Sequence, residues 1–113
     1  MSKSACPDFV RSLPECENPF PGVCGWLLVG DTGCLLFGET EVEMPVPEHS
    51  HCDQWGIVVS DKIKMTIGGE TKVFTAGDSY VVPEGTPHKA KTYPGFASID
   101  YFTDPTRYKA RAR

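Results

Sequence analysis

The sequence contains no apolar run of membrane-spanning length and no excess of basic residues. With 113 residues and a net charge of −4, it offers no reason to expect nucleic acid or an anionic membrane as a partner. No stretch approaches the ~18 apolar residues of a transmembrane helix. The polar residues that follow Met1 lack the apolar core of a secretory signal. We therefore expect a single domain located in the cytoplasm.

The sequence also lacks a Cys-x-x-Cys pair. Its five cysteines are an odd number, which argues against a disulfide framework or a zinc ribbon. Residues 23–103 contain no amphipathic pattern long enough for a substantial helix. The 11 glycines and 10 prolines instead suit short strands joined by turns. The pattern predicts an all-β fold, a double-sheet jelly roll or small barrel.

Three segments are expected along the chain. Residues 1–22 are rich in proline and form an arm, which either frays or packs across a partner subunit. Residues 23–103 form the barrel, and residues 104–113 form a basic tail. Strands are predicted at 25–29, 34–37, 39–44, 49–59, 62–67, 71–75, 79–82, 88–93 and 96–102.

The three histidines lie in two short stretches of suggestive composition. His49 and His51 are one residue apart, so both point to the same face if the segment is a strand. Asp53 continues that alternation, whereas Gln54 is out of phase and needs a bulge to join the same face. His88 has to arrive from a separate strand. Imidazole and oxygen ligands of this kind hold a divalent first-row metal ion.

Together the two stretches resemble the two motifs of the cupin family. The first family motif is Gly-x5-His-x-His-x3–4-Glu-x6-Gly, and here it reads Glu43-x5-His49-x-His51-x2-Gln54-x6-Asp61. The second is Gly-x5-Pro-x-Gly-x2-His-x3-Asn, and here it reads Gly77-x5-Pro83-x-Gly85-x2-His88-x3-Thr92. The resemblance implies a double-stranded β-helix, or jelly-roll barrel. It also implies one divalent ion (Zn, Ni, Fe or Mn) held by His49, His51, Gln54 and His88.

The departures from the family pattern concern the turns and the fourth ligand. Glu43 and Asp61 replace glycines, and Gln54 stands where the family usually has glutamate. Spacing to the following turn selects Gln54 as the aligned ligand, with Asp53 as the alternative. Three imidazoles and an amide leave the ion its full double charge, which favours anionic ligands.

The segment Asp100-Tyr101-Phe102, in the last predicted strand, resembles that of a narrower group. This group is the small cupins of pectin degradation, which convert unsaturated uronates to linear ketonised sugar acids. That resemblance implies a catalytic Asp100 and substrate contacts from Phe102 and Arg107. By alternation Asp100 and Phe102 share one strand face. The alternative for Asp100 is a structural carboxylate paired with a nearby Lys or Arg.

Three functions follow as hypotheses. The first is a metal-dependent isomerase or lyase acting on a sugar acid or a similar oxygenated acid. The second is a metal-dependent dioxygenase, and the third is a non-catalytic barrel that binds a small molecule. A small anionic substrate and a homodimer are the expected partners. The dimer is expected because Trp55, Ile57 and Val59 form an outward apolar stripe that needs a cover.

Overall fold

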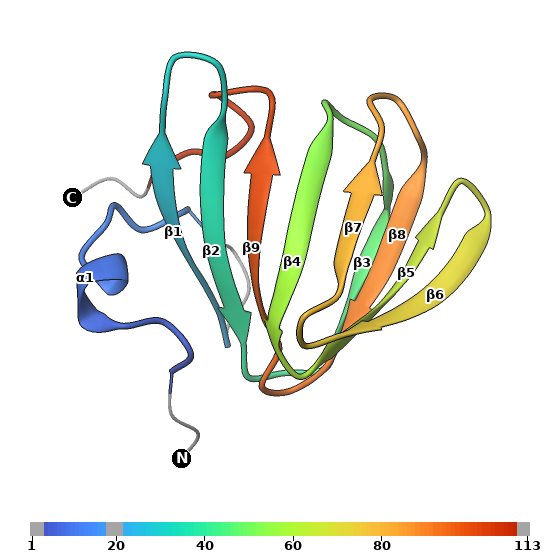
Figure 1. Ribbon diagram of the computed structural model, residues 1–113, viewed down its shortest axis with the longest axis horizontal. Helices are drawn as coiled ribbons and strands as arrows, with labels where there is room; N and C mark the ends of the chain where they lie inside the picture. The colour runs from blue at the N-terminus through green and yellow to red at the C-terminus, as the bar shows by residue number, and fades with distance from the viewer. Residues whose placement is uncertain (1–3, 18–21, 111–113) are drawn as a thin grey trace.

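The computed structural model describes residues 4–17 and 22–110. Nearly all of the regular structure in this part of the chain is β-strand, arranged in two antiparallel sheets (Figure 1). The elements are α1 (Asp8–Arg11), β1 (Val23–Val29), β2 (Cys34–Thr40), β3 (Met44–His49), β4 (Gln54–Ser60), β5 (Lys62–Ile67), β6 (Glu70–Thr75), β7 (Ser79–Val82), β8 (His88–Thr92) and β9 (Ala97–Phe102).

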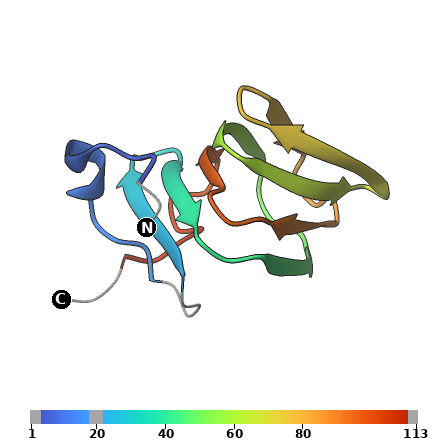
Figure 2. The same cartoon turned by 90° about the horizontal axis from the view of Figure 1, so that it is seen from below.

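One sheet has five strands in the order β1-β2-β9-β4-β7, and the other has four in the order β3-β8-β5-β6. Neighbours in space are mostly distant in sequence, and the chain crosses repeatedly between the sheets. Figure 2 shows the same arrangement of strands from below. This is the predicted jelly-roll barrel.

The apolar core fills the space between the two sheets. Its buried members are Val58, Ile63, Met65, Phe74, Tyr80, Val82 and Phe96. Ile63 and Met65 are buried and alternate with exposed lysines on β5, as the sequence pattern predicts. Because alternate side chains of a strand face opposite sides, this register leaves the inner face apolar and the outer face solvated.

The prediction of one continuous strand over residues 49–59 is wrong. Strand β3 ends at His49, residues 50–53 form a loop, and β4 begins at Gln54. Backbone carbonyls of this loop accept hydrogen bonds from other segments of the chain. Gly85 N donates to His51 O at 2.9 Å, and Thr103 N donates to Asp53 O at 3.1 Å. These bonds tie the loop to the segments before β8 and after β9.

The described part of the arm packs on its own barrel. Cys16 N donates to Gly25 O at 2.8 Å, and Leu27 N donates to Pro14 O, also at 2.8 Å. The arm therefore adds to the β1 edge, and α1 lies beside that edge in Figure 1. These residues are therefore not frayed, and packing across a partner subunit stays a prediction. The division into arm, barrel and tail stays a prediction. Within residues 4–17 and 22–110, no helix is long and apolar enough to cross a membrane.

Candidate metal centre

The rings of His49, His51 and His88 meet at the open end of the barrel. One ligand nitrogen from each ring can be chosen so that all three lie within 4.8 Å of one another. His88 Nε2 is 3.1 Å from His51 Nε2. Two nitrogens bound at right angles to an ion at about 2.1 Å would be roughly 3 Å apart. The spacing of these two rings therefore already suits a shared metal ion.

Backbone carbonyls determine which nitrogen of each ring is free. His49 Nδ1 lies 2.8 Å from Pro47 O, His51 Nδ1 lies 2.8 Å from Cys52 O, and His88 Nδ1 lies 2.9 Å from Thr86 O. A carbonyl oxygen only accepts, so each Nδ1 carries the hydrogen. The neutral rings then present Nε2 lone pairs, and a cation is what these lone pairs can share.

Two neighbouring strands bring the histidines together. His49 on β3 is the register partner of His88 on β8, and His51 follows in the loop. The first expectation, that His49 and His51 share a strand face, is therefore replaced by a strand end and a loop. Gly85 has φ +78°, a conformation that favours glycine, and its N–H holds the carbonyl of His51.

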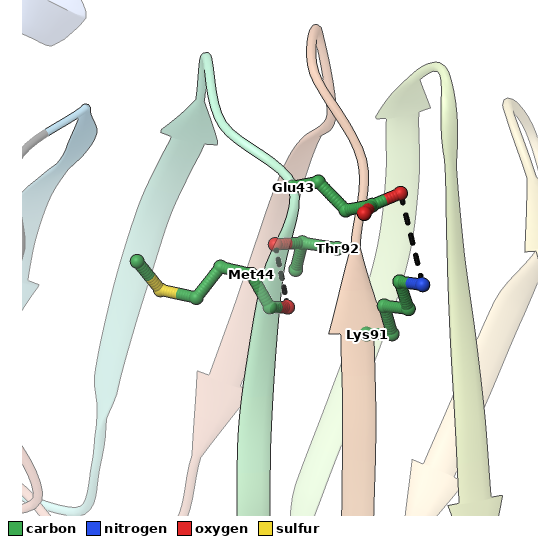
Figure 3. A network of polar contacts seen from close by, with 4 residues as sticks. All are labelled: Glu43, Met44, Lys91 and Thr92. Atoms are coloured by element: carbon green, nitrogen blue, oxygen red, sulfur yellow. Dashed lines mark hydrogen bonds and ion pairs between the residues drawn. The ribbon is translucent and has the colours of Figure 1, made fainter.

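The far ends of the same two strands are also joined through side chains. Figure 3 shows Glu43 paired with Lys91 and Thr92 bonded to the backbone of Met44. The ion pair is 3.7 Å long, and Thr92 Oγ1 donates to Met44 O at 3.3 Å. Both residues of the ion pair are about half exposed, so it adds little energy. These contacts hold the two strands together at the end away from the histidines, and the register shifts between Val46 and His49 before His49 pairs with His88.

Of the two candidates for the fourth ligand, Gln54 lines the cavity with the histidines and Asp53 does not. The Asp53 carboxylate accepts a hydrogen bond from Glu84 N at 2.7 Å. Gln54 opens β4 on its inward face. The out-of-phase position is corrected by the loop at residues 50–53, and not by the bulge that we expected.

Asp100, on β9, is hydrogen-bonded to Gln54 on β4 and is 5% exposed. It accepts hydrogen bonds from Gln54, Tyr80 and Ser98. No Lys or Arg among the described residues forms an ion pair with it, so the structural alternative of a paired charge does not apply. Burial raises the pKa of the Asp100 carboxyl, and the three hydrogen bonds oppose that rise.

Burial acts on the histidines in the opposite direction. It lowers the pKa of both His51 and His88 below the ordinary value for imidazole, because desolvation disfavours the charged ring. The positive charge of Arg107 lowers both pKa values further. The two rings are therefore held neutral, which is the form that binds a metal ion.

The sequence suggests Phe102 and Arg107 as substrate contacts. Both pack beside residues that line the cavity, and neither lines it. Phe102 is 1% exposed, and its ring centroid lies 5.5 Å from that of His51. The guanidinium carbon of Arg107 lies 4.4 Å from the centroid of the Tyr108 ring. Arg107 Nε is buried without a hydrogen-bond partner among the described residues.

Tyr108 lines the cavity, and the sequence analysis did not single it out. Burial raises the pKa of its phenol to about 12. The tail reaches the cavity because it is anchored. Cys34 Sγ lies 3.6 Å from Asp104 O, and Glu17 N donates to Lys109 O at 2.7 Å. The Lys109 side chain itself is exposed.

The cavity around the histidines has a volume of about 170 Å³. Besides the three rings it is lined by Gln54, Tyr80, Ser98, Asp100 and other residues. A larger cavity of about 580 Å³ lies between the arm and β1, near Arg11 and Trp26. None of the histidines lines that larger cavity. The chemistry-bearing side chains therefore converge on the smaller one.

A jelly-roll barrel with three histidines at its open end defines a metal-binding class of cupins. Residues 37–93, about half of the chain, match the cupin domain family, and the chain belongs to that family. Its three-histidine group fits a divalent metal site. In sequence the chain is similar to an H2HPP isomerase of Bacillus subtilis, with 33% identity over 94 residues.

That similarity covers 72% of this chain and 38% of the Bacillus subtilis protein, so the chain spans less than half of its relative. Two solved structures are similar over most of both chains. KdgF from Halomonas sp. has 25% identity, a TM-score of 0.72 and coverage of 81% of this chain and 86% of its own. An RmlC-like cupin from Shewanella frigidimarina has 28% identity, a TM-score of 0.72 and coverage of 83% and 86%.

Proposed function

We propose that this cupin is a metal-dependent isomerase or lyase that acts on a sugar acid or a similar small oxygenated acid. The observation that carries the proposal is the set of three imidazoles whose ligand nitrogens lie within 4.8 Å of one another, each with its Nδ1 bonded to a backbone carbonyl. When bound, the ion would supply Lewis-acid polarisation of a carbonyl or carboxylate oxygen. His49, His51, His88 and Gln54 would hold it.

The relatives support an isomerase. The Bacillus subtilis protein is named an isomerase, and KdgF covers nearly the whole length of this fold. KdgF matches 81% of this chain with a TM-score of 0.72. The resemblance of residues 100–107 to the small cupins of pectin degradation also supports the proposal. From these we propose an unsaturated uronate or an enolisable keto acid as the substrate class.

We assign the substrate carboxylate to Arg107. The buried Nε of this residue has no partner in the described part of the chain, and a planar guanidinium binds a carboxylate through two parallel hydrogen bonds. Its guanidinium carbon lies 4.4 Å from the ring centroid of Tyr108, which lines the cavity. We assign the movement of a proton to Asp100, and Phe102 supports the ring of His51.

We also propose that the protein is a homodimer that pairs through the outer face of the five-stranded sheet. One apolar row crosses this face, because Val81, Trp55, Tyr101, Leu35 and Leu28 are successive register partners. Val81 is 60% exposed, Leu28 51% and Trp55 44%. An apolar row that spans a whole sheet face matches a second copy of itself.

The proposed activity is tested with purified protein whose metal content is measured by elemental analysis. Unsaturated uronates and enolisable keto acids are offered to the zinc-loaded and metal-free protein in D₂O, and ¹H NMR follows product and deuterium incorporation. An oxygen electrode monitors the same reactions. The variants are His49→Ala, Asp100→Asn and, as a control, Lys64→Ala, which changes an exposed residue on β5 that does not line the cavity.

We expect about one ion per chain, turnover with redox-inert zinc, and no oxygen uptake. His49→Ala should lose the ion, and Asp100→Asn should lose turnover at saturating zinc. Substrate-dependent oxygen uptake would replace the isomerase with a dioxygenase. A protein that holds metal but turns over none of these acids would instead be a binding barrel.

A further inference from the structure

Asp100 is placed to act on Gln54 as well as on a substrate. Gln54 Nε2 donates to Asp100 Oδ1 at 2.9 Å, Tyr80 Oη donates to the same oxygen at 2.6 Å, and Ser98 Oγ donates to Oδ2 at 2.7 Å. All three neighbours are neutral donors, so the carboxylate is held as an acceptor in a buried pocket. Such a satisfied network has one well-defined geometry.

Gly56 makes this network possible. On β4 it is the register partner of Tyr80 on β7 and of Asp100 on β9. A Cβ at Gly56 would overlap Asp100 Oδ1 and would lie 2.5 Å from two ring carbons of Tyr80. Tyr80 can therefore reach Asp100 across the middle strand only because that strand carries no side chain between them.

The same hydrogen bond orients the amide of Gln54. A carboxylate only accepts, so the Gln54 nitrogen must face Asp100. The amide oxygen, its one metal-ligating atom, is then the group left for the cavity that Gln54 shares with the three histidines. Without Asp100 the amide has no fixed preference between presenting its oxygen and presenting its nitrogen.

We propose that Asp100 is a positioning residue for the metal site. It holds the amide of Gln54 so that the oxygen faces the ion, and it keeps a carboxylate one hydrogen bond away from the ion. The inference rests on the proposed metal site. It gives Asp100 an effect on metal affinity that is separate from any movement of a proton.

The first experiment measures metal affinity by titrating the metal-free protein with zinc in a calorimeter. Outer partners of metal ligands commonly contribute 10- to 100-fold in affinity. We therefore expect Asp100→Ala, which leaves the Gln54 amide without its acceptor, to bind zinc roughly 10- to 100-fold more weakly than the unchanged protein. The matched control is Asp31→Ala, the same substitution at an exposed turn, which should leave the affinity unchanged.

The second experiment observes the Gln54 amide directly. Gln54 is the only glutamine in the sequence, so selective ¹⁵N labelling of the glutamine side chain leaves a single side-chain amide to follow. In the metal-free and zinc-loaded protein we expect one of its two protons to be shifted downfield and to exchange slowly with solvent. In Asp100→Ala that shift and that protection should disappear.

The outcomes separate this inference from the proposed function. If the unchanged protein binds no zinc, the metal site itself fails. If it binds zinc but Asp100→Ala binds within about twofold of it, the positioning role is overturned and the metal site stands. Two Gln54 amide protons that exchange freely in the unchanged protein would also overturn the positioning role.

Discussion

His88 Nε2 lies 3.1 Å from His51 Nε2, and the Nδ1 of each ring is bonded to a backbone carbonyl. Two neutral rings arranged in this way repel unless a cation lies between them. Binding of a divalent ion should therefore stabilise the fold. At an ion concentration of 100 times Kd the stabilisation is about 2.7 kcal/mol. A thermal melt with and without zinc measures it.

His88→Ala should abolish the zinc-induced rise in Tm, because it removes one of the three converging nitrogens. Lys64→Ala, at an exposed position on β5 outside the cavity, should retain the rise. A rise of equal size in both variants would mean that zinc binds elsewhere.

The metal-free protein should lose stability as the pH falls. Burial lowers the pKa of His51 and His88 in the folded state, so below about pH 6.5 the unfolded chain takes up protons that the folded chain does not. The stability contributed by the neutral rings is present above that pH and is lost as the pH falls through the lowered folded values. Thermal melts of the metal-free protein between pH 8 and pH 5 give the slope.

A variant with both His51→Gln and His88→Gln should lose less stability over this interval, because it no longer contains the two buried rings. Equal pH slopes in the two proteins would show that other groups cause the loss.

Gly56→Ala should destabilise the protein. The added methyl group has to displace Asp100 or Tyr80, and overpacking of this kind costs about 1–3 kcal/mol. Gly38→Ala on β2 is the matched control, since its nearest neighbour would lie 4.0 Å away. Urea unfolding compares the two variants. If Gly56→Ala were as stable as Gly38→Ala, the close approach over β4 would not exist in solution.

Arg107→Gln should raise KM for an acidic substrate, because one charge-assisted contact to the carboxylate is lost. Such a contact contributes about 1.5–3 kcal/mol, so we expect KM to rise roughly tenfold or more. Lys109→Gln removes an exposed positive charge two residues further along and serves as the control. Steady-state kinetics with the substrate found above decides, and an unchanged KM would remove Arg107 from the binding site.

Trp55→Lys should convert the dimer to a monomer, because it places a charge in the middle of the apolar row on the five-stranded sheet. Val73→Lys changes an equally exposed residue (49%) on the other sheet and should leave the dimer intact. Sedimentation velocity measures both. A monomeric unchanged protein would contradict the proposed interface directly.

Local pattern was sufficient to predict the fold. Strand alternation and turn residues act over a few positions, so Ile63 and Met65 could be placed in the core without any tertiary information. The inward face of β9 at Asp100 and Phe102 follows from the same rule. Gly56 inside a strand was a usable signal of a close approach, but nothing in the sequence names the groups that approach.

The resemblance to the two family motifs singled out the three histidines, because the motifs record which residues are needed and how far apart they lie. Only the tertiary structure decides which distant segments form hydrogen bonds with one another. The loop at residues 50–53 accepts hydrogen bonds from distant segments, which brings Gln54 into the cavity and turns Asp53 away. The tail carries Tyr108 into the cavity through contacts with the arm and β2. Such contacts depend on which backbone groups remain unpaired after the sheets have formed, and that is a property of the whole fold.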